Sequence, residues 1–291
     1  MSIKIRDDEE CWCKSGKMYA NCHKRFDDRL KKLRLIRKKV PGRNLIKTPE
    51  QIKRIKESAK INVSVLDHIG EVIKEGMTTA EIDRIVYDMT TKMGGIPAPL
   101  NYEGFPYSVC TSVNDQVCHG FPSDKVVLQE GDIINVDCST ILNGAFSDSS
   151  RMFCIGHVDP QIKRLVEVTR ESVYEGLKAV KPWGYLGDMS AAVHDYVYDR
   201  GYTIVREIGG HGVGNQFHED PWVGFHMKRG TGMVLAPGLM FTIEPMVNFG
   251  DEDIYVSDEN DWEVYTDDGL PSAQWEIQVL VTEEGTEIIS W

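Results

Sequence analysis

The stretch GDIINVDCSTILNGAFSDSSRMFCIG, residues 131–156, decides the architecture of this 291-residue chain. Strand-forming residues lie on both sides of Asn143-Gly144, and an Asn-Gly pair between two such runs is a strong signal of a two-residue β-hairpin turn. If these two residues form the turn, Leu142 faces Ala145, and the numbers of facing residues sum to 287. The sequence therefore predicts a long hairpin across this stretch.

Two acids lie in the predicted hairpin. Asp137 is placed opposite Ser150, and Asp148 opposite Ser139. Because side chains alternate between the faces of a strand, both carboxylates lie on one face as diagonal neighbours, with backbones roughly 7–8 Å apart. Two carboxylates on a half-buried surface repel each other and are costly to desolvate, which favours a cation between them. Solvent exposure of both acids is the alternative.

The composition fits one large domain, or two fused halves, with a small appendage. The chain has 291 residues, of which 41% are hydrophobic, enough to fill such a core. No apolar run approaches the roughly 18 residues of a membrane span, and the N-terminus is charged from Lys4 onward. We therefore expect a cytoplasmic protein without membrane contact, whose seven cysteines are thiols or metal ligands rather than disulfides.

The net charge of −12 is unevenly distributed. Residues 1–48 hold 15 Lys and Arg against six Asp and Glu, a net charge of +9. The remainder holds 18 against 39, a net charge of −21. This asymmetry predicts a basic head, residues 1–47, attached to an acidic body, residues 48–291.

Four potential metal ligands lie within thirteen residues of the head: Cys11, Cys13, Cys22 and His23. Thiolates and imidazole suit a tetrahedral structural zinc site, and the Ser-Gly-Lys sequence at 15–17 permits the turn between the ligand pairs. The segment CWCKSGKMYANCH resembles the SEC-C-type zinc motif, which implies one structural Zn. Reduced surface cysteines are the alternative.

A short basic helix is predicted next in the head. Phe26, Leu30 and Leu33 recur near helical spacing amid Lys and Arg, and Pro41-Gly42 ends the pattern. Beside a zinc motif, so many cations favour contact with phosphate backbones or an acidic protein face. A solvated tether is the alternative.

Two similar helix pairs are predicted in the body. Thr48 and Pro49 begin the first helix, and a capping-box pattern at Thr78 and Glu81 begins the second. The segment QIKR at 51 recurs as QIKR at 161, an offset of 110. The segment AEIDRIVYD at 80 recurs as AAVHDYVYD at 191, an offset of 111. Two helix pairs, each followed by strands, predict a pseudo-symmetric α+β body with helices outside a curved antiparallel sheet and a ligand site between the halves.

The second half adds one histidine and two glutamates in unusual surroundings. His211 stands in GGHGVG, where glycines let the backbone approach a site closely. Glu244 in FTIEPMVN and Glu276 in SAQWEIQ are flanked by apolar strand residues, and a charged Glu there is costly unless it is paired or coordinated. Together with Asp137 and Asp148, these residues fit a two-metal site with mainly oxygen ligands.

Because these motifs occur in this order along the chain, residues 48–291 resemble the type I methionine aminopeptidases of the M24 metallopeptidase family. Members of that family have the pseudo-two-fold creatinase or pita-bread fold. The resemblance implies that Asp137 chelates one metal and that Asp148 and Glu276 bridge both. His211 and Glu244 would complete the shell of the other metal. Two divalent cations, which could be Co, Mn, Fe, Ni or Zn, would ready a water molecule for attack near neutral pH.

The resemblance also assigns catalytic and substrate-binding residues. Glu244 would carry the proton to the leaving amine. His119 would lie near the substrate amine, and His218 would donate a hydrogen bond to the substrate carbonyl oxygen. The methionine side chain would enter an apolar pocket. By position, the residues of this pocket are Tyr102, Phe105, Cys110, Phe217 and Trp262.

The chain departs from the family pattern at three places. Pro99 stands where many members carry cysteine, Phe105 replaces a common tyrosine, and Ile277-Gln278 stands where His-Thr is frequent. The first two bear on the breadth of the pocket and the third on the outer metal environment. None removes a ligand, so activity is expected.

We therefore expect a monomeric enzyme that removes the initiator methionine from nascent polypeptides when the second residue is small. The basic head would add docking near the ribosomal exit. One alternative is an aminopeptidase P or prolidase relative, although those usually carry a sizeable N-terminal domain. The other is a pita-bread binding protein that has lost its metals.

Overall fold

The predicted hairpin lies at the centre of the first half of the molecule. In the computed structural model, which describes residues 5–291, it consists of β4 (Ile133–Leu142) and β5 (Ala145–Cys154). The strands pair from Leu142 opposite Ala145 to Ile133 opposite Cys154, which is the predicted register. Asn143 and Gly144 have φ of 51° and 73°, as a type I′ turn requires. Two short strands, β1 (Ile96–Pro97) and β2 (Cys110–Val113), pair antiparallel with β4.

The strands of the second half form a five-stranded antiparallel sheet in the order β15-β14-β9-β7-β8. Two smaller sheets, β13-β10-β6 and β11-β12-β3, complete the strands. The strands of the five-stranded sheet are β7 (Gly210–Gly212), β8 (Glu219–Val223), β9 (Met240–Ile243), β14 (Ile277–Val281) and β15 (Thr286–Ser290). The others are β3 (Gln116–Cys118), β6 (Thr203–Ile204), β10 (Met246–Asn248), β11 (Ile254–Val256), β12 (Val264–Thr266) and β13 (Ser272–Gln274).

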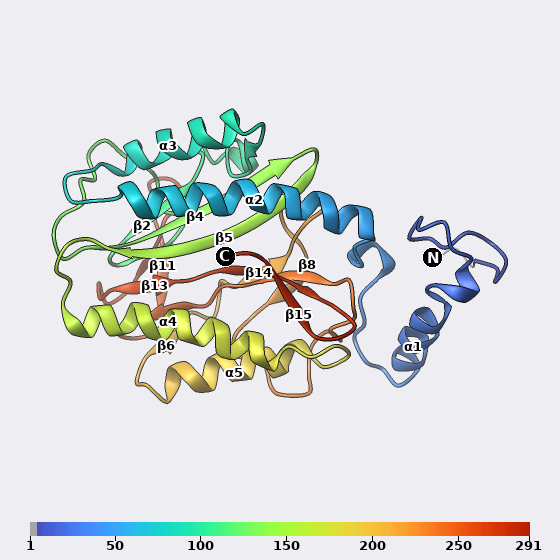
Figure 1. Ribbon diagram of the computed structural model, residues 1–291. Helices are drawn as coiled ribbons and strands as arrows, with labels where there is room; N and C mark the ends of the chain where they lie inside the picture. The colour runs from blue at the N-terminus through green and yellow to red at the C-terminus, as the bar shows by residue number, and fades with distance from the viewer. Residues whose placement is uncertain (1–4) are drawn as a thin grey trace.

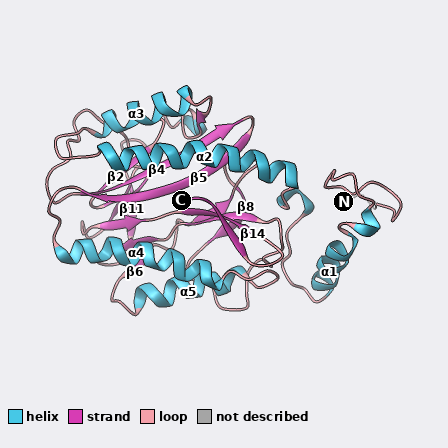
Figure 2. Cartoon of the chain, viewed as in Figure 1, coloured by secondary structure: helices cyan, strands magenta, loops and turns pink. Residues whose placement is uncertain are grey.

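The two predicted helix pairs lie outside the strands, one pair for each half (Figures 1 and 2). The first pair is α2 (Pro49–Val72) and α3 (Thr79–Lys92), and the second is α4 (Pro160–Ala179) and α5 (Leu186–Tyr198). Thr48 and Thr78 cap α2 and α3 with complete capping boxes, as the sequence predicts. The internal repeat therefore corresponds to a structural repeat, and the pseudo-symmetric α+β architecture is confirmed.

The hydrophobic core consists of two main clusters, one under each helix pair. Leu66 of α2 and Ile82 of α3 are fully buried with Ile134 and Val136 of β4 in the first. Each such side chain contributes roughly 1.5–3 kcal/mol to the hydrophobic stabilisation. The second cluster joins α4 and α5 to the five-stranded sheet and β10. Both clusters hold the strands that carry the acids, so the core fixes the relative position of the two halves.

The head packs against the body through the helix α1 (Lys24–Leu35) and through the segment that follows it, in which Lys39 and Ile46 form β-bridges with Met233 and Leu239. Phe26 and Leu30 are buried in the core cluster of the second half. The rings of Phe26 and Trp183 lie 5.2 Å apart, and the guanidinium of Arg29 lies 4.1 Å above the Trp183 ring. A solvated tether is therefore the wrong description of this helix, because its apolar face is covered by the body.

No helix within residues 5–291 has both the length and the apolar composition needed to cross a membrane.

Candidate active site

The β4–β5 hairpin brings Asp137 and Asp148 to one face. Asp137 faces Ser150 and Asp148 faces Ser139, in the predicted register. The Ser139 hydroxyl donates a hydrogen bond to Asp148 Oδ1 at 2.7 Å, and the Asp148 N–H donates to Gln278 Oε1 at 3.1 Å. The buried Asp137 Oδ1 has no hydrogen-bond partner within the described chain. Asp148 is thus held by its neighbours, whereas one oxygen of Asp137 is left for a ligand.

His211 in β7 directs one ring nitrogen at the acids of both halves. Its Nδ1 lies 3.0 Å from Gly212 O, and since a carbonyl oxygen only accepts, Nδ1 carries the proton. The unprotonated Nε2 then lies 3.6 Å from Asp148 Oδ2 and 3.7 Å from Glu244 Oε1. A histidine whose tautomer is fixed by a carbonyl and whose free nitrogen faces carboxylates has the arrangement of a metal ligand.

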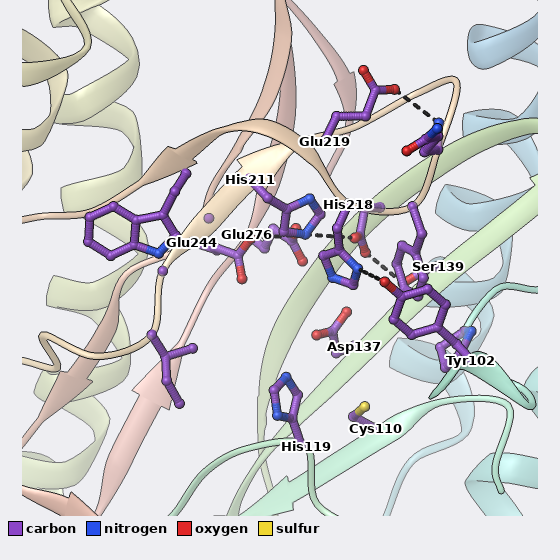
Figure 3. A pocket seen from close by; sticks show the side chains of 18 of the residues that line it. Tyr102, Cys110, His119, Asp137, Ser139, His211, His218, Glu219, Glu244 and Glu276 are labelled. Carbon is purple, nitrogen blue, oxygen red and sulfur yellow. Dashed lines mark hydrogen bonds and ion pairs between the residues drawn. The ribbon is translucent and has the colours of Figure 1, made fainter. Parts of the chain in front are cut away.

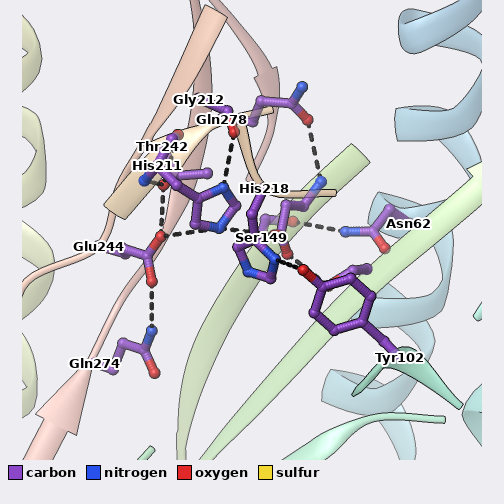
Figure 4. A network of polar contacts seen from close by, with 12 residues as sticks. Asn62, Tyr102, Ser149, His211, Gly212, His218, Thr242, Glu244, Gln274 and Gln278 are labelled. Carbon is purple, nitrogen blue, oxygen red and sulfur yellow. Dashed lines mark hydrogen bonds and ion pairs between the residues drawn. The ribbon is translucent and has the colours of Figure 1, made fainter. Parts of the chain in front are cut away.

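Thr242 in β9 aligns His211 with Glu244. Its hydroxyl accepts the backbone N–H of His211 at 3.0 Å and donates to Glu244 Oε1, while Gln274 Nε2 donates to Glu244 Oε2 at 3.2 Å (Figure 4). Gly210 permits this close approach, because a Cβ there would lie 2.7 Å from the Thr242 hydroxyl oxygen. Both oxygens of Glu244 are therefore oriented before any ligand binds.

Glu276 joins the group from the two-residue connection between β13 and β14. Its backbone N–H donates to Ser150 O at 3.2 Å, which ties it to the hairpin. Its Oε1 is buried and has no hydrogen-bond partner in residues 5–291. One ligand atom from each of Asp148, His211 and Glu276 lies within 4.8 Å of the others, which is close enough to coordinate one cation.

The buried carboxylates are not stable as anions without a counter-charge. Burial raises the pKa of Asp137 to about 7 and that of Glu244 to about 8. Burial, with the charges of neighbouring acids, raises the pKa of Asp148 and Glu276 well above the usual range. Bound divalent cations would reverse these shifts. Four carboxylates, a neutral imidazole and two unpartnered oxygens fit such cations, because these donors suit hard and borderline divalent metals.

His119 and His218 flank this group of acids from other segments (Figure 3). Burial, with a smaller contribution from nearby His218, lowers the pKa of His119 to about 4. Burial also lowers the pKa of His218, and its ring centroid lies 4.2 Å from that of His211. His218 Nδ1 lies 2.9 Å from the Tyr102 hydroxyl oxygen. Both histidines are therefore neutral near pH 7 and can donate a proton in a hydrogen bond.

A cavity of about 1110 Å³ opens over the acids and is large enough for a short peptide. Phe105 and Trp262 meet edge to face at 5.2 Å, as do Tyr102 and Phe217 at 4.9 Å. Cys110 also lines this cavity, near His119 and Asp137 (Figure 3). The five residues predicted for a methionine pocket thus line the same cavity as the five predicted ligands, His119 and His218.

The cavity lining includes residues that the sequence did not predict. All the predicted side chains line it: Tyr102, Phe105, Cys110, His119, Asp137, Asp148, His211, Phe217, His218, Glu244, Trp262 and Glu276. Sequence reasoning missed Gln274 and Asn44, which also line it, and Thr242, which holds two ligands from behind. Thr242 and Gln274 each precede a predicted ligand by two positions, so strand alternation places them on its face and was the available signal. No comparable signal marks Asn44.

The four predicted ligands of the head also lie together. Cys11 Sγ and Cys22 Sγ are each 3.2 Å from His23 Nδ1, and Cys13 Sγ is 3.6 Å from Cys22 Sγ. One ligand atom from each lies within 4.8 Å of the others. Gly16, with φ of 75°, makes the turn between the pairs. This geometry is compatible with a four-coordinate metal ion.

A family model described as metallopeptidase family M24 matches residues 53–283 of the chain. A protein of Chlamydia trachomatis named methionine aminopeptidase is 37% identical over 98% of this chain and 99% of its own length. The methionine aminopeptidase of Escherichia coli is 42% identical over 84% of this chain and 93% of its own length. The match to the Chlamydia protein extends over the head, whereas the other leaves about a sixth of this chain uncovered.

The fold is also similar to a solved structure. The crystal structure of methionine aminopeptidase from Rickettsia prowazekii superposes with a TM-score of 0.83 and 39% identity, over 84% of this chain and 99% of that one. The similarity in sequence and that in structure therefore cover the same body.

Proposed function

Because the chain belongs to metallopeptidase family M24, we propose that it removes the initiator methionine from nascent polypeptides whose second residue is small. The observation that carries this proposal is the position of an apolar aromatic pocket beside four buried carboxylates and a neutral histidine in one cavity. Such a cavity offers both a site for the methionine side chain and a site for the cations that activate water.

Five side chains would hold two divalent cations in this proposal: Asp137, Asp148, His211, Glu244 and Glu276. The close grouping of Asp148, His211 and Glu276 supports a shared site, and the unpartnered oxygen of Asp137 supports its extension toward the hairpin. When bound, the cations lower the pKa of water and polarise the scissile carbonyl. Because the donors are mainly oxygen, Co, Mn, Fe, Ni and Zn all fit.

Glu244 is proposed to move the proton during hydrolysis. Because Thr242 and Gln274 orient its two oxygens, Glu244 is fixed in the cavity where the attacking water would lie. It would take the proton from water and release it to the leaving amine.

His218 and His119 are proposed to bind the substrate's polar atoms. Burial raises the pKa of the Tyr102 hydroxyl, so this group keeps its proton, and we propose that it donates to His218 Nδ1, 2.9 Å away. The remaining proton of the neutral His218 ring is then on Nε2, where it can donate to the substrate carbonyl as negative charge develops. His119 would contact the region of the substrate amine.

The methionine side chain is proposed to lie among Tyr102, Phe105, Cys110, Phe217 and Trp262. Aromatic rings and a thiol are polarisable, and sulfur–aromatic contacts contribute about 0.3–1.5 kcal/mol. Phe105 is only 2% exposed, so it forms the base of the pocket rather than its rim. Its lack of a hydroxyl keeps that base apolar, which favours the thioether of methionine over a polar side chain.

The head is proposed to bind one zinc ion and to dock on the ribosome. The clustered Cys11, Cys13, Cys22 and His23 support the metal site, and the net charge of +9 over residues 1–48 supports contact with ribosomal RNA. An enzyme of this kind would act in the cytoplasm, where nascent chains appear, and as a monomer, because one chain supplies all the proposed ligands.

A tripeptide assay tests the proposed function. The purified protein, reconstituted with each divalent metal in turn, should release methionine from Met-Ala-Ser and leave Ala-Pro-Ser intact, because the aromatic pocket is built for a methionine side chain. Elemental analysis of the same samples identifies the bound metal. Cleavage of Ala-Pro-Ser alone would support the prolidase alternative, and inactivity with every metal would support the binding-protein alternative; either result would refute the proposal.

A further inference from the structure

Lys47 is a buried cation that the proposed chemistry does not use. It lies where the head meets α2, yet its side chain is 0% exposed. Its Nζ donates to Glu219 Oε2 at 2.6 Å and lies 3.5 Å from Leu45 O. Burial lowers the pKa of the Lys47 ammonium, and the charge of Glu219 opposes that shift. A buried ammonium and a buried carboxylate stabilise each other only when both are present.

Glu219 uses its other oxygen to close a loop that carries two predicted site residues. Oε1 accepts the backbone N–H groups of Asn215 at 2.7 Å and Gln216 at 2.9 Å. The enclosed residues are Phe217 and His218, and Glu219 begins β8. One carboxylate therefore joins the start of this loop to its end, and we call residues 215–219 the histidine loop (Figure 3).

The rest of Lys47 is fixed as closely as its amine. Its backbone N–H donates to Gly238 O at 2.8 Å. Its stem packs against Gly214, where a Cβ would lie 2.9 Å from Lys47 Cε. Gly214 has φ of 134°, a conformation that favours glycine, and it directly precedes the histidine loop. The ammonium therefore has little room to move away from Glu219.

We propose that Lys47 is a positioning residue that acts through Glu219 to hold the histidine loop over the active site. The opposite side of the loop is held by aromatic contacts, since the His218 ring lies 4.2 Å from that of His211 and hydrogen-bonds Tyr102. Without the ammonium, Glu219 is an unpaired buried anion that draws in water or turns outward, and the loop loses its closing bonds. The inference rests on the proposed role of His218 in catalysis.

A consequence is that the junction between head and body belongs to the catalytic unit. Ile46 and Leu239 form a β-bridge immediately before Lys47, and Asn44 and Leu45 line the cavity. Removing residues 1–47 would therefore also remove the partner of Glu219. A truncation intended to test the head alone must keep Lys47.

The full-length Lys47→Met variant tests the proposal with two independent measurements. Methionine keeps the length of the stem and removes the charge. In the metal-free protein, the Asn215 and Gln216 amides should exchange hydrogen at least about tenfold faster, while the β4–β5 hairpin keeps its protection. In the metal-loaded protein, kcat for Met-Ala-Ser should fall about 10- to 100-fold with a smaller change in KM, because His218 acts mainly as the reaction proceeds. Unchanged exchange and unchanged kcat would overturn the proposal.

A double-mutant cycle shows whether Lys47 acts through Glu219. Glu219→Gln should lower kcat as Lys47→Met does, and the double variant should be no slower than either single variant, because the two groups act as a unit. If the kcat losses of the two single variants multiply in the double variant, Lys47 does not act through Glu219 and the proposal is overturned. Lys56→Met is the matched control, since neither Lys56 nor its partner Glu287, at 2.7 Å, lines the cavity. Its loop exchange rate and its kcat should stay unchanged.

Two outcomes separate this inference from the proposed function. If the wild-type protein hydrolyses no Met-initiated peptide, the hydrogen-exchange measurement on metal-free protein still supports or overturns the loop contact. If Lys47→Met does not fold, Lys47→Gln removes the charge but keeps a group that can donate a hydrogen bond. Faster exchange of the loop in that variant supports the proposal, and unchanged exchange overturns it.

Discussion

At the scale of single residues, hydrogen bonds from its neighbours hold Asp148, a predicted metal ligand, in position. Ser139 and Gln278 hold its carboxyl group and backbone, and its Oδ2 faces His211 Nε2. Burial and the neighbouring acids raise its pKa, so the site is ready for a cation but unfavourable for an unpaired anion. The local sequence places Asp148 on the correct face, and the second half of the chain supplies its environment.

The Asp148→Asn substitution should abolish metal binding and activity together. Asparagine has nearly the same volume and can still accept from Ser139, so the hairpin should fold, but its amide is a poor metal ligand. We expect the metal content to fall in elemental analysis and kcat/KM for Met-Ala-Ser to fall about 100-fold or more. Asp67→Asn is the control, because the Asp67 side chain is 59% exposed and forms an ion pair with Arg151 away from the predicted ligands. Full hydrolysis by the Asp148 variant would refute the ligand assignment.

At the scale of single elements, the helix α1 has an apolar face and an opposite face of exposed cations. Phe26 and Leu30 anchor it to the body, while Lys31, Lys32 and Arg34 are exposed. Because the apolar face is covered, these cations are held at a fixed place on the surface rather than on a moving tether. A fixed cluster of cations beside a candidate metal site is a suitable contact for a phosphate backbone.

Charge reversal on α1 should weaken ribosome binding without affecting chemistry. In Lys31→Glu/Lys32→Glu/Arg34→Glu, cosedimentation with ribosomes at low salt should fall, because fewer counterions are released. Hydrolysis of Met-Ala-Ser should remain within about twofold, since no changed residue lines the cavity. The control is a body variant with the same charge change at exposed lysines, Lys74→Glu/Lys92→Glu/Lys125→Glu. Equal cosedimentation of the two variants would contradict a role for α1.

At the scale of the whole molecule, the two halves bring together acids that stabilise the metal-free protein only when protonated. The pKa values of Asp137 and Glu244 are raised by burial to about 7 and about 8, whereas unfolded carboxyls titrate near 4. The folded state therefore binds more protons between these values, and stability falls as pH rises from about 4 until it passes about 8. Burial lowers the pKa of His211 to about 3 and that of His119 to about 4, which opposes this trend only below about 6.5.

The metal-free protein should consequently lose thermal stability between pH 6.5 and 8.5. In a chelator, its Tm should fall by a few degrees across this interval, because only the carboxyl contribution changes there. Saturating divalent metal should remove or reverse the fall, since cations bind the deprotonated acids more tightly at higher pH. Thermal unfolding followed by circular dichroism measures both. A Tm that rises over the same interval without metal would contradict the assignment of these acids to one buried cluster.

The sequence by itself determined the features that depend on neighbouring residues. The Asn143-Gly144 turn and the two-residue period of strands set the hairpin register, which placed Asp137 and Asp148 on one face. Local capping set the beginnings of α2 and α3. The other predicted ligands came from the resemblance of short sequence motifs to those of a known family. The order of these motifs along the chain can be read from the sequence alone.

Only the tertiary structure decided which distant side chains support one another. Lys47 and Glu219 are 172 residues apart, and nothing near either residue indicates that an ammonium in the head's junction closes the histidine loop. Thr242 shows its function only when β7 packs beside β9 and places the His211 backbone against its hydroxyl. Such contacts form only when the helices and sheets pack together around the shared core. Core packing sets the distances between residues that are remote in sequence, and local backbone geometry does not predict these distances.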